Sequence, residues 1–236
     1  RGIRFFGTAI LLWKSPGAQV ADNEFLYASA SRRALGAHAA EFDAGAAFGI
    51  TLQPPGPTDI KIPGTLLGSN NAQPSYHVVS NNTFYRSEAS AVVCQSCSHD
   101  LFEQNEVAEA AYPLGHALQL AGIYCNNMTF RRNTLRTDGV GSIGQLWGTG
   151  IVAELNHVSD SGKLVTDNQC IGGGSPSHYC TMRYNWLHDS TGLGLRFDAG
   201  TDGEFSEFNA LQFNVVARNQ QGGLAIKSNN ASTYRN

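Results

Sequence analysis

The chain has 236 residues, of which 15% are charged and 26 are glycine, and its formal net charge is −3. A charge this small gives no electrostatic basis for binding nucleic acid or an anionic membrane surface. No apolar run approaches the length of a membrane span, and no signal peptide is visible.

Short apolar runs recur along the chain and predict strands. Residues 9–13, 91–94 and 224–226 form such runs, and each begins 12 to 14 residues before an asparagine. They are too short and too rich in β-branched residues for helices. We therefore predict that each repeat consists of two strands, each followed by a turn.

An asparagine returns at the same point of a repeated pattern, apolar-x-x-Asn-x-apolar. From Asn82 onward the spacings are 23, 28, 23, 29 and 29 residues, and a last copy follows 22 residues later. A strand-only repeat of this length is typical of a parallel β-helix of about eight to nine coils. The predicted ladder comprises Asn23, Asn82, Asn105, Asn133, Asn156, Asn185, Asn214 and Asn236.

The spacing of the pattern also predicts a corner. Side chains two positions apart on a strand point to the same face, so the apolar residue two positions after Asn points inward with it. The apolar residue three positions before Asn can point inward only if the alternation of faces is interrupted by one residue, and such an interruption is a corner. Asparagine suits such a corner because it tolerates a left-handed backbone and bonds to nearby backbone groups. Stacked coils would supply partners for the buried amides as a ladder at a spacing of ~4.8 Å.

Residues 30–71 are less regular and contain four prolines, Pro54, Pro55, Pro57 and Pro63. One coil is expected between Asn23 and Asn82, with residues 48–52 as its strand, and the remainder as a surface excursion. We expect residues 1–236 to form a single β-helix domain. The chain begins at Arg1 and stops within a repeat, so we also expect a fragment of a longer protein with open ends that another domain or copy covers.

Five cysteines can be placed on the repeat. Cys97 and Cys125 each lie eight residues before a ladder Asn, so stacking predicts a Cys97–Cys125 disulfide. Cys170 and Cys180 flank a glycine-rich loop and are predicted to close it. Cys94 is expected to be a buried thiol. Cys94 and Cys97 could instead form a redox or metal motif. No second pair of Cys or His residues matches this motif, so no metal is expected.

Three glycosylation sequons begin at Asn81, Asn127 and Asn230. Asn127 and Asn230 both lie six residues before a ladder Asn, which predicts one accessible outer turn. Two disulfides and these sequons favour an extracellular or cell-surface location.

The segments 184–190 and 192–198, Tyr-Asn-Trp-Leu-His-Asp-Ser and Gly-Leu-Gly-Leu-Arg-Phe-Asp, are similar to coils of secreted right-handed parallel β-helix proteins of the pectate-lyase-like superfold. This resemblance implies the fold over nearly the whole chain. It leaves the activity open, because these families include lyases, glycosidases, epimerases and inert stalks.

Candidate catalytic groups cluster late in the chain. Asp160 and Asp189 each follow a ladder Asn by four residues, and two adjacent carboxylates can cleave a glycosidic bond or hold Ca²⁺. His188 could add a base, and Arg196 and Asp198 a charged clamp. The alternative is structural, because Asp and Ser are ordinary turn residues and Arg196 and Asp198 can simply pair.

Aromatic residues offer a further candidate surface. The side chains of Trp147, Trp186, Tyr124 and Tyr184 could stack on sugar rings or serve as packing.

Three functions follow as hypotheses. The first is an extracellular structural module whose ends or faces dock other copies or domains into a fibre or surface layer. The second is a polysaccharide lyase, glycosidase or epimerase acting on a groove along the β-helix. The third is a non-catalytic carbohydrate-binding module. Expected partners are copies of the chain, neighbouring domains, polysaccharide or attached glycans; no nucleic acid, membrane span or cofactor is expected.

Overall fold

The computed structural model describes residues 1–7, 10–13, 17–27, 50–53, 75–87, 90–95, 97–110, 119–123, 125–144, 146–165, 167–174, 176–198 and 206–236. Most of the predicted excursion at 30–71, and Tyr124, lie outside these residues. The expected strand at 48–52 is confirmed as β5, which spans Ile50–Gln53. The described residues contain no helix long and apolar enough to cross a membrane.

Three parallel sheets of eight strands each form the walls of the molecule. Sheet A contains β1 (Arg4–Phe6), β4 (Glu24–Leu26), β7 (Thr83–Tyr85), β10 (Glu106–Ala110), β14 (Thr134–Asp138), β18 (His157–Ser159), β22 (Trp186–His188) and β25 (Val215–Ala217). Sheet B contains β2 (Ile10–Trp13), β5, β8 (Val92–Gln95), β11 (Leu120–Ile123), β15 (Ile143–Gly144), β19 (Gln169–Gly173), β23 (Leu193–Phe197) and β26 (Gly222–Ile226).

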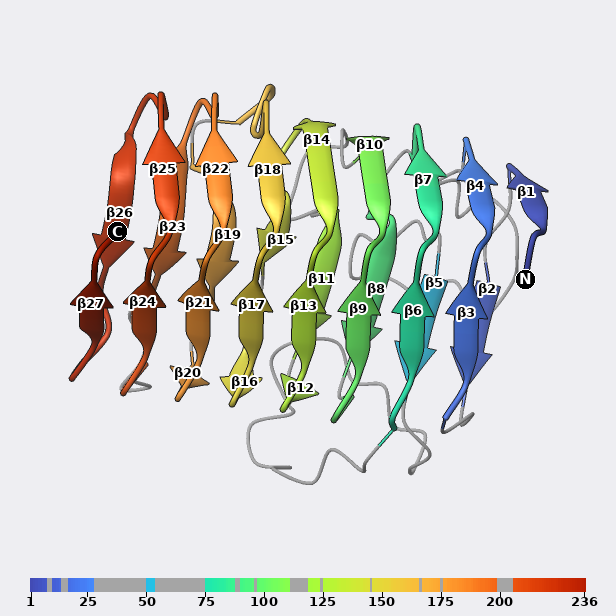
Figure 1. The fold of residues 1–236 in the computed structure, drawn as a ribbon, viewed down its shortest axis with the longest axis horizontal. Helices are drawn as coiled ribbons and strands as arrows, with labels where there is room; N and C mark the ends of the chain where they lie inside the picture. Colours follow the sequence, from blue (N-terminus) through green and yellow to red (C-terminus); the bar gives the residue numbers. More distant parts are fainter. Residues whose placement is uncertain are drawn as a thin grey trace, which may run out of the picture.

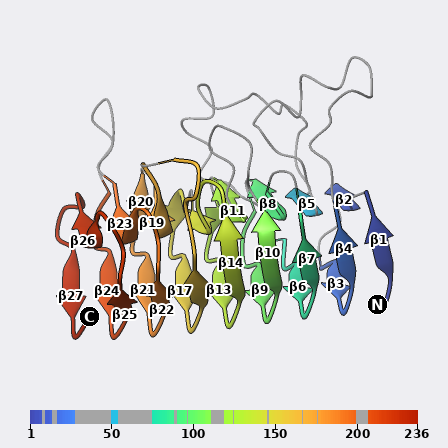
Figure 2. The same ribbon diagram turned by 90° about the horizontal axis from the view of Figure 1, so that it is seen from above.

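Sheet C contains β3 (Gln19–Ala21), β6 (Val78–Ser80), β9 (Leu101–Glu103), β13 (Thr129–Arg131), β17 (Val152–Glu154), β21 (Thr181–Arg183), β24 (Ala210–Gln212) and β27 (Ser232–Tyr234). A small fourth sheet joins β12 (Cys125–Asn126), β16 (Gly148–Thr149) and β20 (Ser177–His178). The chain visits sheets C, A and B in turn, and each strand pairs with its counterpart one coil away (Figure 1). The labelled ends of the chain lie at opposite ends of the stack (Figure 2).

The repeat pattern sets the register between coils. Val79 pairs with Val20 and Phe102, and Phe84 pairs with Phe25 and Val107, so equivalent positions of the pattern stack directly. Both apolar positions of the pattern point inward and are buried. The prediction of a β-helix with about eight coils is therefore confirmed.

The asparagine ladder runs through all the predicted residues. In each step the side-chain oxygen of one Asn accepts from the backbone N of the preceding ladder Asn at 3.0–3.1 Å and from its Nδ2 at 2.7–3.2 Å. The Nδ2 of Asn133 also donates to the backbone oxygen of Phe102 at 3.0 Å. Every amide is thus satisfied by the coil above and the coil below.

The left-handed backbone at this corner belongs to the residue before the asparagine, which corrects our expectation. Arg132, Leu155 and Tyr184 have φ of 54°, 57° and 56°. The ladder Asn itself does not have positive φ, because its backbone N and side chain both serve the ladder. Two further left-handed corners occur in each coil, four residues after and six residues before the ladder Asn.

Aromatic rings fill part of the interior. Phe25 stacks on Phe5 and Phe84 with ring centroids 4.7 and 4.8 Å apart, and Phe102 stacks on Phe130 at 4.9 Å. Four of these rings, Phe25, Phe84, Phe102 and Phe130, are completely buried. Stacking of equivalent positions thus packs the core as well as satisfying the backbone.

Candidate functional site

Asp160 and Asp189 occupy equivalent corners of consecutive coils. They follow β18 and β22, in which Ser159 pairs with His188, and both have left-handed backbones with φ of 57° and 60°. The expectation that they lie on the same outer corner matches this placement.

Their carboxylates have separate partners. Asp189 accepts from Arg218 Nε at 2.6 Å and Nη2 at 2.8 Å, and from His188 Nδ1 at 2.6 Å. Asp160 pairs with Lys163 Nζ at 3.0 Å. The hydrogen bond from Arg218, followed by that from His188, holds the pKa of Asp189 well below its usual range. Asp189 is therefore an ionised, clamped carboxylate at neutral pH and a poor proton donor.

A histidine pair extends this cluster across sheet A. His157 Nε2 lies 2.9 Å from His188 Nε2, and Trp186 stacks on His157 with centroids 4.4 Å apart. Burial and the neighbouring His188 lower the pKa of His157. When both rings are neutral, the Nε2 of one histidine can carry its proton and donate it to the Nε2 of the other.

Arg196 and Asp198 lie on sheet B in a different cluster. Arg196 Nε contacts Asp198 at 2.8 Å, Lys227 Nζ lies 3.2 Å from the same carboxylate, and Arg196 also pairs with Asp167. Among the described residues, the hydrogen bonds and ion pairs of this cluster do not extend to His188 or Asp189. The structure thus brings Asp189 and His188 together but places Arg196 and Asp198 apart from them.

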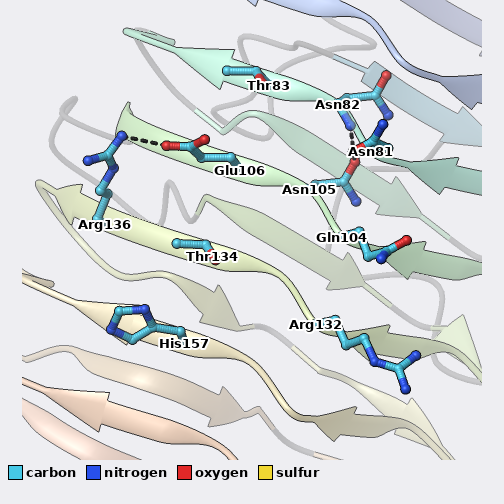
Figure 3. Close-up of a pocket in the computed structure, with 10 residues that line it drawn as sticks. All are labelled: Asn81, Asn82, Thr83, Gln104, Asn105, Glu106, Arg132, Thr134, Arg136 and His157. Carbon is cyan, nitrogen blue, oxygen red and sulfur yellow. Dashed lines mark hydrogen bonds and ion pairs between the residues drawn. The ribbon is translucent and has the colours of Figure 1, made fainter.

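A groove of about 460 Å³ runs along the corner between sheets C and A (Figure 3). Its lining is polar throughout: Asn81, Asn82, Thr83, Gln104, Asn105, Glu106, Arg132, Thr134, Arg136 and His157. Two of the lining residues, Glu106 and Arg136, form an ion pair (Figure 3). Amide, carboxylate and guanidinium groups along the groove can form several hydrogen bonds to an extended polar ligand.

Our interpretation of the sequence missed this groove, although the repeat contains the signal for it. Asn81, Gln104 and Arg132 each precede a ladder Asn, and Thr83, Glu106, Thr134 and His157 each follow one. Stacking therefore turns two positions of the pattern into two outward rows.

The cysteine pairings are corrected by the structure. Cys97 is bonded to Cys94, with Cα atoms 6.1 Å apart, instead of to Cys125, so Cys94 is not a thiol. The predicted stacking is nevertheless present, because Ser98 pairs with Asn126 and Cys97 N lies 3.4 Å from Cys125 Sγ. The repeat correctly predicts that Cys97 faces the coil of Cys125. It does not predict whether Cys97 forms its disulfide with Cys125 or with Cys94.

Cys170 and Cys180 do not bond to each other. Cys170 lies in β19 of sheet B, and Cys180 directly precedes β21 of sheet C. Cys180 Sγ lies near the backbone oxygens of Gly148 and His178, and Cys170 Sγ near Asn219. Burial raises the pKa of these thiols to about 12 for Cys170 and about 11 for Cys180.

The three sequon asparagines lie at exposed left-handed corners. Asn81, Asn127 and Asn230 have φ of 51°, 52° and 50°. Asn127 and Asn230 belong to the same outer row, as their spacing predicts, and attachment of glycans stays a prediction.

Two of the predicted sugar-stacking aromatics are half exposed. Tyr184 stacks on Phe213 and Trp186 on His157, so their faces are largely used within the solenoid. Trp147 packs over Gly174, where an added Cβ would lie 1.4 Å from its Nε1.

The two clusters of possible metal ligands in the described residues lie elsewhere than Asp160 and Asp189, the expected calcium pair. One cluster joins Cys94, Cys97 and Cys125, and the other His77, Cys97 and Asp100.

A family model described as right-handed β-helix region matches residues 64–236. The chain belongs to the right-handed β-helix family. No curated protein and no solved structure matches it significantly. Membership of the β-helix family accounts for the stacked parallel sheets, whereas the activity must be argued from the side chains.

Proposed function

We propose that this β-helix is a structural module of an extracellular protein, which docks other copies or neighbouring domains into a fibre or surface layer. The observation that carries the proposal is the pairing of every candidate catalytic group with a neighbour on the solenoid. Asp189 is clamped by Arg218, Asp160 by Lys163, and Asp198 by Arg196 and Lys227.

Such pairing suits a scaffold better than a hydrolase. Cleavage of a glycosidic bond needs one carboxyl that can donate a proton and a second group flanking the same bond. The lowered pKa of Asp189 makes that carboxyl a poor proton donor. Groups on sheets A and B would also have to act on one substrate although they form separate clusters.

The extracellular location is supported by two features. The Cys94–Cys97 disulfide favours an oxidising compartment, and the three sequons lie at exposed corners. Glycans at Asn127 and Asn230 would project from one edge, so sheets A and B would stay open for contacts between copies.

Electron microscopy of the native protein tests this proposal. We expect ordered filaments or sheets in which the β-helix repeats between copies. Dispersed monomers that cleave an acidic or neutral polysaccharide would contradict the proposal. In that case the D189N variant would be compared with the D160N variant to find the carboxylate that matters.

A second candidate is carbohydrate binding in the groove between sheets C and A. The groove favours it because amide and charged groups line its whole length, which suits the many hydroxyls of a polysaccharide (Figure 3). A glycan array should then give hits that weaken at least tenfold in a Gln104→Ala, Arg132→Ala double variant. Arg183→Ala, which removes an arginine outside the groove lining, is the matched control; equal binding by both variants would rule out the groove.

A further inference from the structure

Three sulfur atoms gather inside the solenoid. Cys94 lies in β8, Cys97 follows it, and Cys125 begins β12 one coil further on. Their Sγ atoms all lie within 4.8 Å of one another, and all three residues are fully buried. Sequence spacing alone places only Cys94 and Cys97 in a motif, and the stacking of coils adds the third sulfur.

A histidine and an aspartate form a second cluster, which shares Cys97 with the first. A ring nitrogen of His77, Cys97 Sγ and a carboxylate oxygen of Asp100 also lie within 4.8 Å of one another. Both residues are buried, and Asp100 Oδ2 lies 3.2 Å from His77 Nδ1 and 3.2 Å from Cys94 Sγ. Asp100 is itself fixed, because its Oδ1 accepts from Ser75 Oγ and His77 N at 2.8 Å each.

We propose that the reduced chain binds one Zn²⁺ through Cys94, Cys97, Cys125 and His77. Three thiolates and one imidazole form a common tetrahedral zinc site, whose sulfurs lie roughly 3.8 Å apart when each Zn–S bond is ~2.3 Å. The three sulfurs already lie within 4.8 Å of one another. His77 lies within the same distance of Cys97, and its ring has to turn toward the other two sulfurs to complete the geometry. With Nδ1 held by Asp100, His77 coordinates through Nε2, and the carboxylate orients the ring as a positioning residue.

The zinc site and the disulfide exclude each other, because both use Cys94 and Cys97. A phosphine reductant converts the disulfide to two thiols, taking the oxygen of one water to become a phosphine oxide. Zinc then forms three bonds to sulfur and one to nitrogen, and the three thiols release three protons. The ion would connect three consecutive coils, since His77, Cys97 and Cys125 each belong to a different one.

The other buried thiols supply internal controls. Cys170 and Cys180 are as buried as the cluster, but neither belongs to a group of three metal ligands among the described residues. A Cys180→Ser variant therefore tests loss of a core thiol without loss of a ligand.

The test is a titration of the full chain with Co²⁺, after anaerobic reduction with a phosphine. We expect one equivalent per chain, with thiolate-to-cobalt charge-transfer absorption and the visible bands of tetrahedral cobalt, both abolished by added Zn²⁺. Cys125→Ser should weaken binding at least tenfold, and Cys180→Ser should bind as the unsubstituted chain does. Zinc should also raise the thermal midpoint of the reduced chain and leave that of the Cys125→Ser variant unchanged.

If the Cys125→Ser variant does not fold, X-ray absorption spectroscopy of the zinc-loaded, unsubstituted chain tests the proposal by identifying the atoms bound to zinc. Three sulfur neighbours at ~2.3 Å and one nitrogen at ~2.0 Å would support the site. Fewer than three sulfurs, a reduced chain without thiolate-to-cobalt absorption, or unchanged cobalt binding by folded Cys125→Ser would each overturn it.

Discussion

At the scale of single residues, the ladder asparagines contribute a carbonyl acceptor and an NH2 donor, which only an amide side chain offers together. The carbonyl oxygen of Asn133 accepts from the backbone N and Nδ2 of Asn105, and its amide donates to Phe102 O and Asn156 Oδ1. Aspartate lacks the donor, and a shorter side chain reaches none of these partners.

Replacement of Asn133 by alanine should therefore leave several buried polar groups without hydrogen-bond partners. Each such group costs about 1–3 kcal/mol, so we expect a loss of about 3 kcal/mol in the free energy of unfolding. Urea denaturation measures it, with Asn229→Ala, at an exposed position, as the control. A loss no larger than that of the control would mean that water or a shifted backbone replaces the ladder bond.

A buried carboxyl makes stability depend on pH. Burial raises the pKa of Asp138 from 3.8 to about 6, although Ser142, Ser161 and Gly162 donate hydrogen bonds to it. Because the folded state binds the proton more tightly, this contribution is fully present below pH 3.8 and is lost as the pH rises through 6.

An Asp138→Asn variant resembles the protonated carboxyl and should lack this dependence. Between about pH 4 and pH 7, the unsubstituted chain should lose about 2–3 kcal/mol relative to the variant. Urea midpoints across this range test the expectation, and parallel profiles for the two proteins would refute it.

At the scale of the coil, the left-handed corners explain how the chain turns from one sheet to the next. Each coil turns at three left-handed positions, and residues other than glycine occupy most of them. A left-handed backbone costs such residues roughly 1–2 kcal/mol each, and asparagine tolerates it best after glycine. The stacked hydrogen bonds on both sides of a corner hold it in place.

Leu155 is a corner where this cost can be measured. Its φ is 57°, and its side chain is 45% exposed, so little packing is lost on substitution. We expect Leu155→Asn to raise the free energy of unfolding by about 0.5–1 kcal/mol. Val215→Asn, on the exposed strand β25, should lower it, and equal losses at both sites would show that the corner is not strained.

At the scale of the whole molecule, the solenoid is a chain of neighbour contacts. Each strand pairs only with strands one coil away, so the effect of a core change should stay local. The core is continuous, but it is built from contacts between neighbouring coils.

Double substitutions in the phenylalanine stacks test this locality. Phe102→Leu and Phe130→Leu alter rings that stack at 4.9 Å, and their effects on stability should differ from additivity by at least about 0.5 kcal/mol. Phe25→Leu and Phe130→Leu lie about 14 Å apart along the axis and should add within about 0.5 kcal/mol. Coupling of the distant pair would indicate that the solenoid unfolds through long-range strain.

Much of this architecture can be predicted from the sequence. The period of the Asn pattern predicts the coils, the inward apolar rows and the ladder, because buried amides at a repeated position can satisfy one another. The same period places Cys97 opposite Cys125, Asp160 beside Asp189, and Asn127 in the outer row of Asn230.

Only the tertiary structure shows which side chains of one coil contact one another. A period relates one coil to the next, but it does not say which side chains from different parts of one coil meet. For that reason Cys94 bonds Cys97, Asp198 lies apart from His188, and the left-handed residue precedes the asparagine. The meeting of His77 and Asp100 with Cys97 likewise depends on how the corners fold, which no spacing along the chain encodes.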